Sequence, residues 1–460
     1  MNKNNLSEIF EKLSKKEVSE INKAVHSPFF NQKEDVLQLW KILQKGKILP
    51  EKEQLFQQIY GEENFNVKKI YNASSQLLAL MERVLFILEK ENNETAQKLS
   101  ISNWYRKKGL HPLFQTNINE TKAILKNTGL EDDQFYRFTH QIEFEIYEHQ
   151  IADRTSELNL QSLNDSLDLS FLIEKLKKTC LLLSHQAVYK VNYQTGLLTP
   201  ILQHIDNQPS VLERPAVAVY YYCYLLQTQP NEATHFDTFK RLIIEHFAIF
   251  NSADIRVLYL LAVNYCIKKH NAGDEKYAFQ GLELYKKALK DDFLLENGVL
   301  SRFSYRNIVA WALLEKDYDW TEKFINDYKN NLERTFRDSM YSFCLARLEF
   351  SRKNYQAALL LLQKAEYRDI LLGLAAKVIL LKIYYELQET DVLEAHLNSM
   401  KAYIIRKRVL GYHKKNYQNI IFYTKKLMTL NANALEINQL RESIKQERIL
   451  TEKEWFLEQL

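Results

Sequence analysis

The placement of proline constrains this chain more than any other feature of its sequence. All seven prolines lie between Pro28 and Pro230, and the 230 residues that follow contain none. Proline breaks the interior of a helix because it has no amide hydrogen and its ring clashes with the preceding turn. Apolar residues recur at helical spacing almost everywhere, whereas runs that alternate with period two are short. The sequence therefore predicts an all-α protein and permits long, uninterrupted helices in its second half.

Helix start and stop signals organise the first half of the chain. Ser14 and Glu17 have the spacing of a capping box, and similar signals recur further along. We expect short helices that share one core, in an N-terminal helical domain over residues 1–155. The stretch 156–170 is rich in Ser, Asn, Asp and Leu, which is typical of a linker or a loosely packed turn. We place a boundary there and expect divergent helix pairs, or a connector, over residues 156–253.

Units that suggest helix pairs recur in the second half. In the best unit, Tyr355 starts a helix, Ala358 provides a small residue where two helices cross, and Leu362 is a large apolar residue. Weaker units appear near Gly281 and Lys316. Equivalent positions in four successive units are 40, 37 and 35 residues apart, namely Ala288, Tyr328, Ala365 and Met400.

This pattern resembles the tetratricopeptide repeat, a helix pair of about 34 residues. The resemblance covers residues 254–403, although Lys353 stands where the family usually has glycine and the closing proline is absent. It implies an α-solenoid, in which antiparallel helix pairs stack into a right-handed superhelix with a concave face. We expect residues 404–460 to form capping helices.

The resemblance also implies a function, because the concave surfaces of such repeats bind other proteins. We therefore expect a non-enzymatic interaction scaffold that binds a protein partner in its groove. The first helix of each repeat usually lines the groove in this family. Arg302 and Arg306 share one face of such a helix and are candidate binding residues. The Lys and Asn pattern of the chaperone-binding members is missing.

One segment, residues 401–426, is strongly basic. It contains eight basic residues, five interleaved aromatic residues and no acidic residue. Cations beside aromatic rings are typical of surfaces that bind nucleic acid, which is our alternative hypothesis for function. The other interpretation is a solvated face whose charge is offset by acidic residues of 386–394. The candidate binding residues of this segment are Arg406, Lys407, Arg408, Tyr412, Lys414, Lys415, Tyr417, Lys425 and Lys426.

No motif for nucleophilic catalysis or phosphate binding occurs in the chain. Cys266 and His270 lie four residues apart, but we interpret them as a buried cysteine and a histidine at a helix end. Glu145 and His149 are also four apart, a spacing that would allow them to pair on the surface. We therefore expect no enzyme activity, no cofactor, no metal and no small-molecule substrate.

The overall charge, the cysteines and the lengths of the apolar stretches indicate where in the cell the protein is located. Sixty-two Lys and Arg against 58 Asp and Glu leave a net charge of +4, too small to steer the whole molecule toward a polyanion. The four cysteines lie far apart without a C-x-x-C pair, so we expect reduced core thiols. No apolar stretch approaches the about 20 residues of a spanning helix, and residues 1–16 lack the apolar segment of a secretory signal. We expect a cytoplasmic protein that does not bind a membrane.

Overall fold

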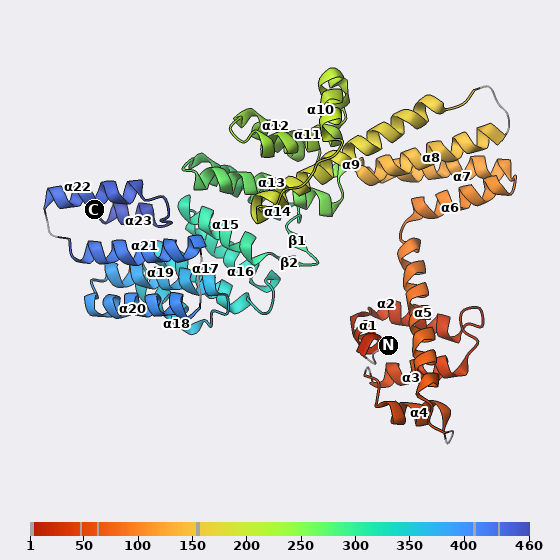
Figure 1. The fold of residues 1–460 in the computed structure, drawn as a ribbon, viewed down its shortest axis with the longest axis horizontal. Helices are drawn as coiled ribbons and strands as arrows, with labels where there is room; N and C mark the ends of the chain where they lie inside the picture. The colour runs from red at the N-terminus through yellow and green to blue at the C-terminus, as the bar shows by residue number, and fades with distance from the viewer. Residues whose placement is uncertain (1–3, 47, 62–63, 153–156, 408–410, 431–432) are drawn as a thin grey trace. The chain divides into compact units, whose positions relative to one another are not determined.

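The prediction of an all-α fold is confirmed by the computed structural model (Figure 1). Apart from one antiparallel pair of two-residue strands, every regular element of the described residues is a helix. None of these helices combines the length and the apolarity needed to cross a bilayer. The structure describes residues 4–46, 48–61, 64–152, 157–407, 411–430 and 433–460.

The chain forms two compact units, which are described separately. Unit 1 comprises Met1–Leu182, Asn192–Tyr220 and Ala248–Phe250, and unit 2 comprises Leu183–Val191, Tyr221–Phe247 and Asn251–Leu460. The helices that lie wholly or largely in unit 1 are α1 (Asn4–Lys12), α2 (Lys15–His26), α3 (Glu34–Gly46), α4 (Lys52–Tyr60), α5 (Val67–Glu91), α6 (Glu94–Lys107), α7 (His111–Asn127), α8 (Asp133–Ala152), α9 (Leu160–Tyr189), α10 (Leu198–Asn207) and η1 (Pro209–Glu213).

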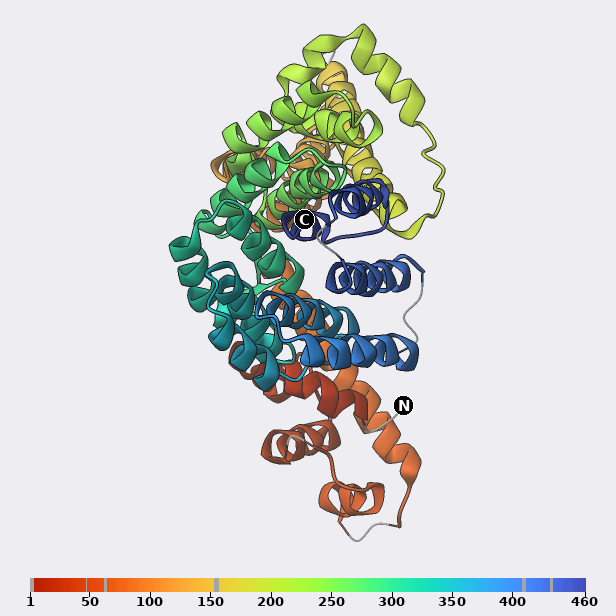
Figure 2. The same ribbon diagram turned by 90° about the vertical axis from the view of Figure 1, so that its left-hand side faces the viewer.

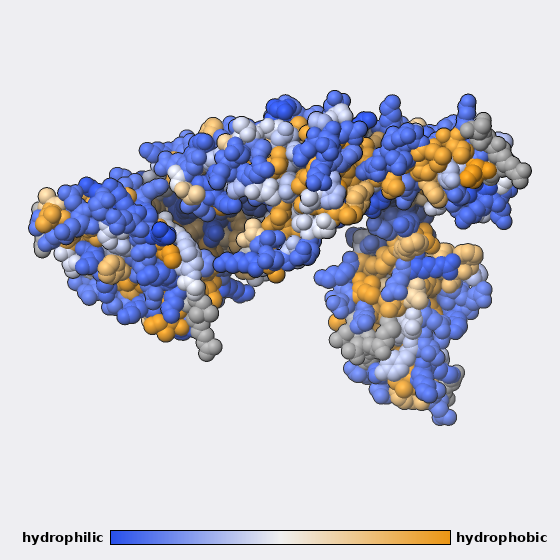
Figure 3. All heavy atoms as spheres, turned by 45° about the horizontal axis from the view of Figure 1, so that its top comes forward, coloured by the Kyte–Doolittle hydropathy of each residue, from blue (hydrophilic) through white to orange (hydrophobic). Residues whose placement is uncertain are grey.

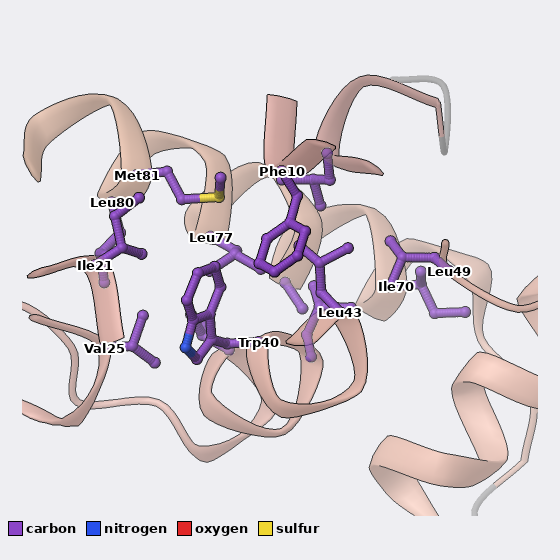
Figure 4. Close-up of a cluster of buried hydrophobic side chains, with 14 of the residues drawn as sticks. Phe10, Ile21, Val25, Trp40, Leu43, Leu49, Ile70, Leu77, Leu80 and Met81 are labelled. Carbon is purple, nitrogen blue, oxygen red and sulfur yellow. The ribbon is translucent and has the colours of Figure 1, made fainter. Parts of the chain in front are cut away.

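Helices α1 to α5 bury one apolar core around Trp40 (Figure 4). The Trp40 side chain is fully buried, meets the Phe10 ring edge-on at 5.5 Å, and donates a hydrogen bond from Nε1 to Asn22 Oδ1 at 3.0 Å. Helix α2 begins with the expected capping box, because Glu17 N donates to Ser14 Oγ and Ser14 N donates to the Glu17 carboxylate. A separate core joins α6, α7 and α8.

Three of the described helices span the division between the units, one of them α9, whose last residues from Leu183 belong to unit 2. Helix α11 (Pro215–Thr228) and the short η2 (Phe247–Ile249) contribute to both units. The other elements of unit 2 are α12 (Ala233–Glu245), α13 (Ser252–Asn271), α14 (Lys276–Lys290), β1 (Leu295–Glu296), β2 (Val299–Leu300), α15 (Arg302–Leu314), α16 (Tyr318–Asp327), η3 (Lys329–Asn331), α17 (Arg337–Ser351), α18 (Tyr355–Lys364), α19 (Ile370–Glu386), α20 (Thr390–Arg406), α21 (Gly411–Met428), α22 (Ala434–Gln446) and α23 (Lys453–Glu458).

Consecutive helices of unit 2 pack as pairs, as the sequence predicts. The pairs are α13 with α14, α15 with α16, α17 with α18 and α19 with α20. The second helix of each pair contacts the first helix of the next, and α17 also contacts both α15 and α19. Figure 2 shows these pairs following one another from green to blue. Each pair therefore shares its apolar surface with the pair before it and the pair after it.

The turn inside each pair has the same backbone conformation. Gly273, Lys316, Lys353 and Gln388 all have positive φ, between 57° and 98°, and each stands two residues after the first helix ends. In the α17–α18 turn, Lys353 N donates to Phe350 O and Asn354 N donates to Glu349 O, at 2.9 and 2.8 Å. This bonding pattern is a Schellman motif, which favours glycine at the left-handed position. Three of the four turns instead hold a residue with a side chain.

Small residues lie where neighbouring helices pack closely, both within a pair and between successive pairs. Ala346 on α17 and Ala358 on α18 are fully buried, at the crossing positions that the sequence predicts. Gly281 on α14 packs against the Trp311 side chain of α15 so closely that a Cβ atom there would lie 2.3 Å from Trp311 Cζ3. All four cysteines are free and buried, as expected.

Candidate functional site

Unit 2 contains a cleft of about 440 Å³ where the first helices of three successive pairs meet. Helices α15, α17 and α19 form its walls, α21 adds one aromatic side chain, and the residues just before α23 close one side. We call this site the arginine cleft. Its lining includes Arg306, Leu313, Leu314, Phe343, Arg347, Phe350, Val378, Ile379, Lys382, Tyr417, Thr451 and Glu452.

Two guanidinium groups in the arginine cleft lack an ionic partner. Arg306 comes from α15 and Arg347 from α17, and neither side chain has a hydrogen bond or an ion pair within 4 Å among the described residues. Burial lowers the pKa of the Arg347 guanidinium and the nearby charge of Arg306 acts in the same direction, whereas the charge of Glu452 acts against both. Because arginine stays protonated in proteins, the site carries two positive charges that an anion would stabilise.

The third cation of the cleft is already paired. Lys382 of α19 forms an ion pair with Glu452, and its ammonium also lies 5.3 Å from the centre of the Trp455 ring. Burial by itself raises the pKa of Glu452, but the charges of Lys382 and Arg347 outweigh burial and lower that pKa overall. Glu452 is therefore ionised at neutral pH, and it contributes one negative charge beside three positive ones.

Two buried asparagines of α21 bind the backbone next to Glu452. Asn416 donates from Nδ2 to Thr451 Oγ1 at 3.1 Å and accepts from Thr451 N at 2.8 Å. Asn419 donates from Nδ2 to Ile449 O at 2.9 Å. A buried amide without such partners would be costly, so these bonds hold the segment before α23 against α21.

Aromatic side chains anchor the residues that follow. Trp455 and Phe456 are buried in a core formed with α19 to α22. The Trp455 ring meets Tyr385 edge-on at 5.4 Å, and its Nε1 donates to Glu386 Oε1 at 3.1 Å.

The structure separates the two arginines that sequence analysis grouped on one face. Arg306 lies in the arginine cleft, whereas Arg302 makes contacts within the protein. The Arg302 guanidinium stacks 3.9 Å from the Phe336 ring centre and lies 3.8 Å from Asp369 and 3.9 Å from Glu333. Arg302 therefore already has anionic and aromatic neighbours.

The basic residues of 401–426 lie on the surface of α20 and α21. Arg406, Lys407, Lys414, Lys415, Lys425 and Lys426 are exposed. None of these six has an ion pair with a described residue. Arg408 lies outside the described residues. Tyr412 is 52% exposed, but Tyr417 is only 8% exposed and packs in the core of α19 to α23. Of the two predicted aromatic binding residues, only Tyr412 is available to a ligand.

The two remaining clusters have structural roles. Cys266 is fully buried and burial raises its pKa to about 12, so the thiol is protonated at neutral pH. His270 has a buried Nδ1 with no hydrogen-bond partner among the described residues. Glu145 does not form the pair with His149 that the spacing allows, because it accepts hydrogen bonds from Arg106 and Asn103, both at 2.8 Å. His149 stacks on Phe114 instead.

Unit 1 exposes apolar side chains at the end of α8 and the start of α9. Figure 3 shows hydrophobic residues gathered there, as well as in other parts of this view. Ile151 and Leu160 are 48% and 52% exposed. These two side chains are apolar and do not indicate the chemistry of a particular ligand, so the arginine cleft is the better-defined site.

Sequence reasoning missed Arg347, Lys382, Asn416, Asn419 and Glu452. The first two had a usable signal, because Arg347 and Lys382 each stand six residues before a turn residue, Lys353 and Gln388 respectively. They therefore occupy the same position in successive first helices. The other three residues gave no such signal, because their roles depend on how the residues just before α23 pack against α19 and α21.

Comparisons with known proteins found no match. Neither the protein-family models, nor the curated proteins, nor the solved structures contain a match to this chain.

Proposed function

We propose that this chain is a non-enzymatic scaffold that binds a protein partner in the arginine cleft. In this proposal the helix pairs of unit 2 form an α-solenoid of the tetratricopeptide type. The contacts between successive first helices and the repeated left-handed turns support that arrangement. The arginine cleft then lies on the concave side, where such proteins bind their partners.

The unpaired Arg306 and Arg347 carry this proposal. The Arg347 guanidinium is partly desolvated and the nearby charge of Arg306 acts against it, so the two groups favour a ligand that brings carboxylates, with which arginine forms short, charge-assisted hydrogen bonds. The apolar walls contributed by Leu313, Phe343 and Val378 would contact the hydrophobic part of the same ligand. An acidic protein segment supplies both kinds of group.

A photo-crosslinking experiment tests the proposal. A photoreactive amino acid replaces Leu314, which lines the cleft and is 49% exposed, or Leu360, which lies on α18 outside the cleft and is 57% exposed. We expect a specific partner to be crosslinked from position 314 and not from position 360. The double variant Arg306→Glu/Arg347→Glu should lose the crosslink.

A charge-matched control separates a site effect from a general effect of charge. Lys290→Glu/Lys364→Glu reverses two exposed lysines of α14 and α18 that lie outside the cleft. This variant should retain the crosslink from position 314. Equal crosslinking from both positions, or full retention after the arginine reversal, would reject the proposal, as would turnover of a metabolite by the pure protein.

The second candidate function is nucleic-acid binding through α20 and α21. The observation that favours it is the set of exposed basic side chains without ion pairs, beside exposed Tyr412 and Phe422. For a single strand, log K falls with log salt by about 0.7 per neutralised phosphate. Lys414→Glu/Lys425→Glu should therefore flatten the salt dependence of binding to a labelled oligonucleotide. Unchanged binding by this variant would remove the hypothesis.

A further inference from the structure

The last residues of the chain are bound in the way that a groove binds a separate peptide. We define the C-terminal segment as residues 447–460. Asn416 and Asn419 contact it through its main chain at Thr451 and Ile449, with one added bond to the Thr451 hydroxyl. Main-chain hydrogen bonds of this kind provide affinity without requiring a particular sequence.

Side chains of the C-terminal segment then occupy distinct subsites. Leu450 is buried, the Glu452 carboxylate pairs with Lys382, and Trp455 enters the core beside Tyr385. The order along the segment is thus a non-helical stretch, an acidic residue and then an aromatic pair at Trp455 and Phe456.

The C-terminal segment satisfies the arginine cleft only in part. Glu452 is its one acidic residue that lines the cleft, and its ion-pair partner is Lys382. Arg306 and Arg347 remain without ion pairs among the described residues. A ligand with the same features and one further carboxylate would therefore be a better electrostatic match than the segment itself.

We propose that the C-terminal segment is an internal ligand, and that the partner is an acidic peptide with the same order of groups that displaces it. This inference rests on the proposed function. It specifies the groups that the partner would present. These are a non-helical backbone that hydrogen-bonds to Asn416 and Asn419, a carboxylate that pairs with Lys382, and an aromatic residue about one helical turn later. Glu452 and the partner's carboxylate compete for the same ammonium.

The test measures binding of a labelled synthetic peptide, ERILTEKEWFLEQL, which is the C-terminal segment itself, to full-length protein by fluorescence anisotropy. Three forms are compared: the unaltered chain, Glu452→Lys, and Asn416→Cys/Thr451→Cys joined by a short reversible thiol crosslinker. The four native cysteines are buried and do not compete for the reagent.

We expect Glu452→Lys to bind the peptide at least about tenfold more tightly than the unaltered chain. If the C-terminal segment leaves its site free in about 10% of the unaltered molecules, the apparent affinity for the peptide is about tenfold lower than for a free site. The crosslinked form should not bind, and reductant should restore binding to it. A peptide with Glu452→Gln or Trp455→Ala should bind more weakly. Thermal unfolding followed by circular dichroism checks that each variant is folded.

Equal peptide binding by all three forms, or by the crosslinked and reduced forms of the double variant, would overturn the inference. A dimer that excess peptide dissociates would also overturn it, because the occupant would then be a second copy of the chain. The proposed function fails separately, through the Arg306→Glu/Arg347→Glu crosslinking result, which does not depend on the C-terminal segment.

Discussion

In the bundle α1 to α5 the apolar faces of five helices converge on Trp40, whereas in unit 2 each helix pair shares its apolar surface with its neighbours along the chain. Among the described residues of the bundle, the buried side chains are apolar, and hydrogen bonds such as that from the Trp40 indole to Asn22 lie at the edge of the core. Unit 2 instead holds Arg306, Arg347 and Lys382 between its first helices.

The difference shows how helix arrangement decides where charge is tolerated. A closed bundle has one interior, and an unpaired charge placed there would lose its hydration without compensation. Successive helix pairs contact one another along the chain and leave part of α15, α17 and α19 against a cleft. The guanidinium groups of Arg306 and Arg347 can persist in that cleft because they are only partly buried.

The largest expected effect is a loss of stability in the bundle α1 to α5. Trp40→Ala removes the largest side chain of the α1 to α5 core, and a buried tryptophan truncated to alanine costs about 3–5 kcal/mol. We expect loss of a separate unfolding transition for the bundle in calorimetry, with the transition of unit 2 retained. Trp104→Ala is the control, because Trp104 is 50% exposed and its removal should change stability little. Equal losses in the two variants would contradict the closed-core account.

The next effect disrupts the packing of helix pairs. Gly281→Val places a side chain against the Trp311 ring, so α14 and α15 must separate, and overpacking of this kind costs about 1–3 kcal/mol. The change should lower the midpoint of denaturant unfolding for unit 2. Gly46→Ala is the matched control, because an added Cβ at Gly46 meets no atom within 4 Å. A neutral Gly281→Val would show that the pairs do not depend on this contact.

A smaller change in the free energy of unfolding, this time a stabilisation, is expected at the turns inside the helix pairs. Lys353 has φ of 61°, a conformation that costs a residue with a side chain about 1–2 kcal/mol relative to glycine. Lys353→Gly removes this cost, but glycine also makes the unfolded chain more flexible, which offsets part of the stabilisation. We therefore expect Lys353→Gly to stabilise unit 2 by about 0.5–1 kcal/mol. Lys323→Gly, inside α16 and exposed, should instead destabilise by about 1 kcal/mol. Both values come from denaturant unfolding, and a loss in both variants would contradict the prediction.

The smallest effect concerns pH. Burial lowers the pKa of His396, whose ring Nε2 lies 2.8 Å from Lys377 O. Because the folded pKa is below the ordinary value of 6.5, the unfolded chain binds the proton more readily. The contribution of His396 to the free energy of unfolding is therefore complete above pH 6.5 and falls as the pH drops toward the folded pKa. His396→Gln should reduce the loss of unit 2 stability between pH 7 and pH 5, and an unchanged pH profile would contradict this.

The sequence by itself determined the helical class and the pairing of neighbouring helices. Both follow from local chemistry: the spacing of apolar residues, the capping box at Ser14, the absence of proline after Pro230, and small residues such as Ala346 and Ala358 where helices cross. Each signal acts within one or two helical turns or between adjacent helices, so it can be recognised without knowledge of the rest of the chain.

Only the tertiary structure decided the composition of the arginine cleft. Arg306, Arg347 and Lys382 come from three helix pairs, and Glu452 returns to them from the far end of the chain. Tyr417, which the sequence predicts as a surface binding residue, is buried because α21 packs against α19 to α23. These outcomes depend on contacts between residues far apart in sequence, and helical spacing alone fixes neither which face of a helix is covered nor what covers it.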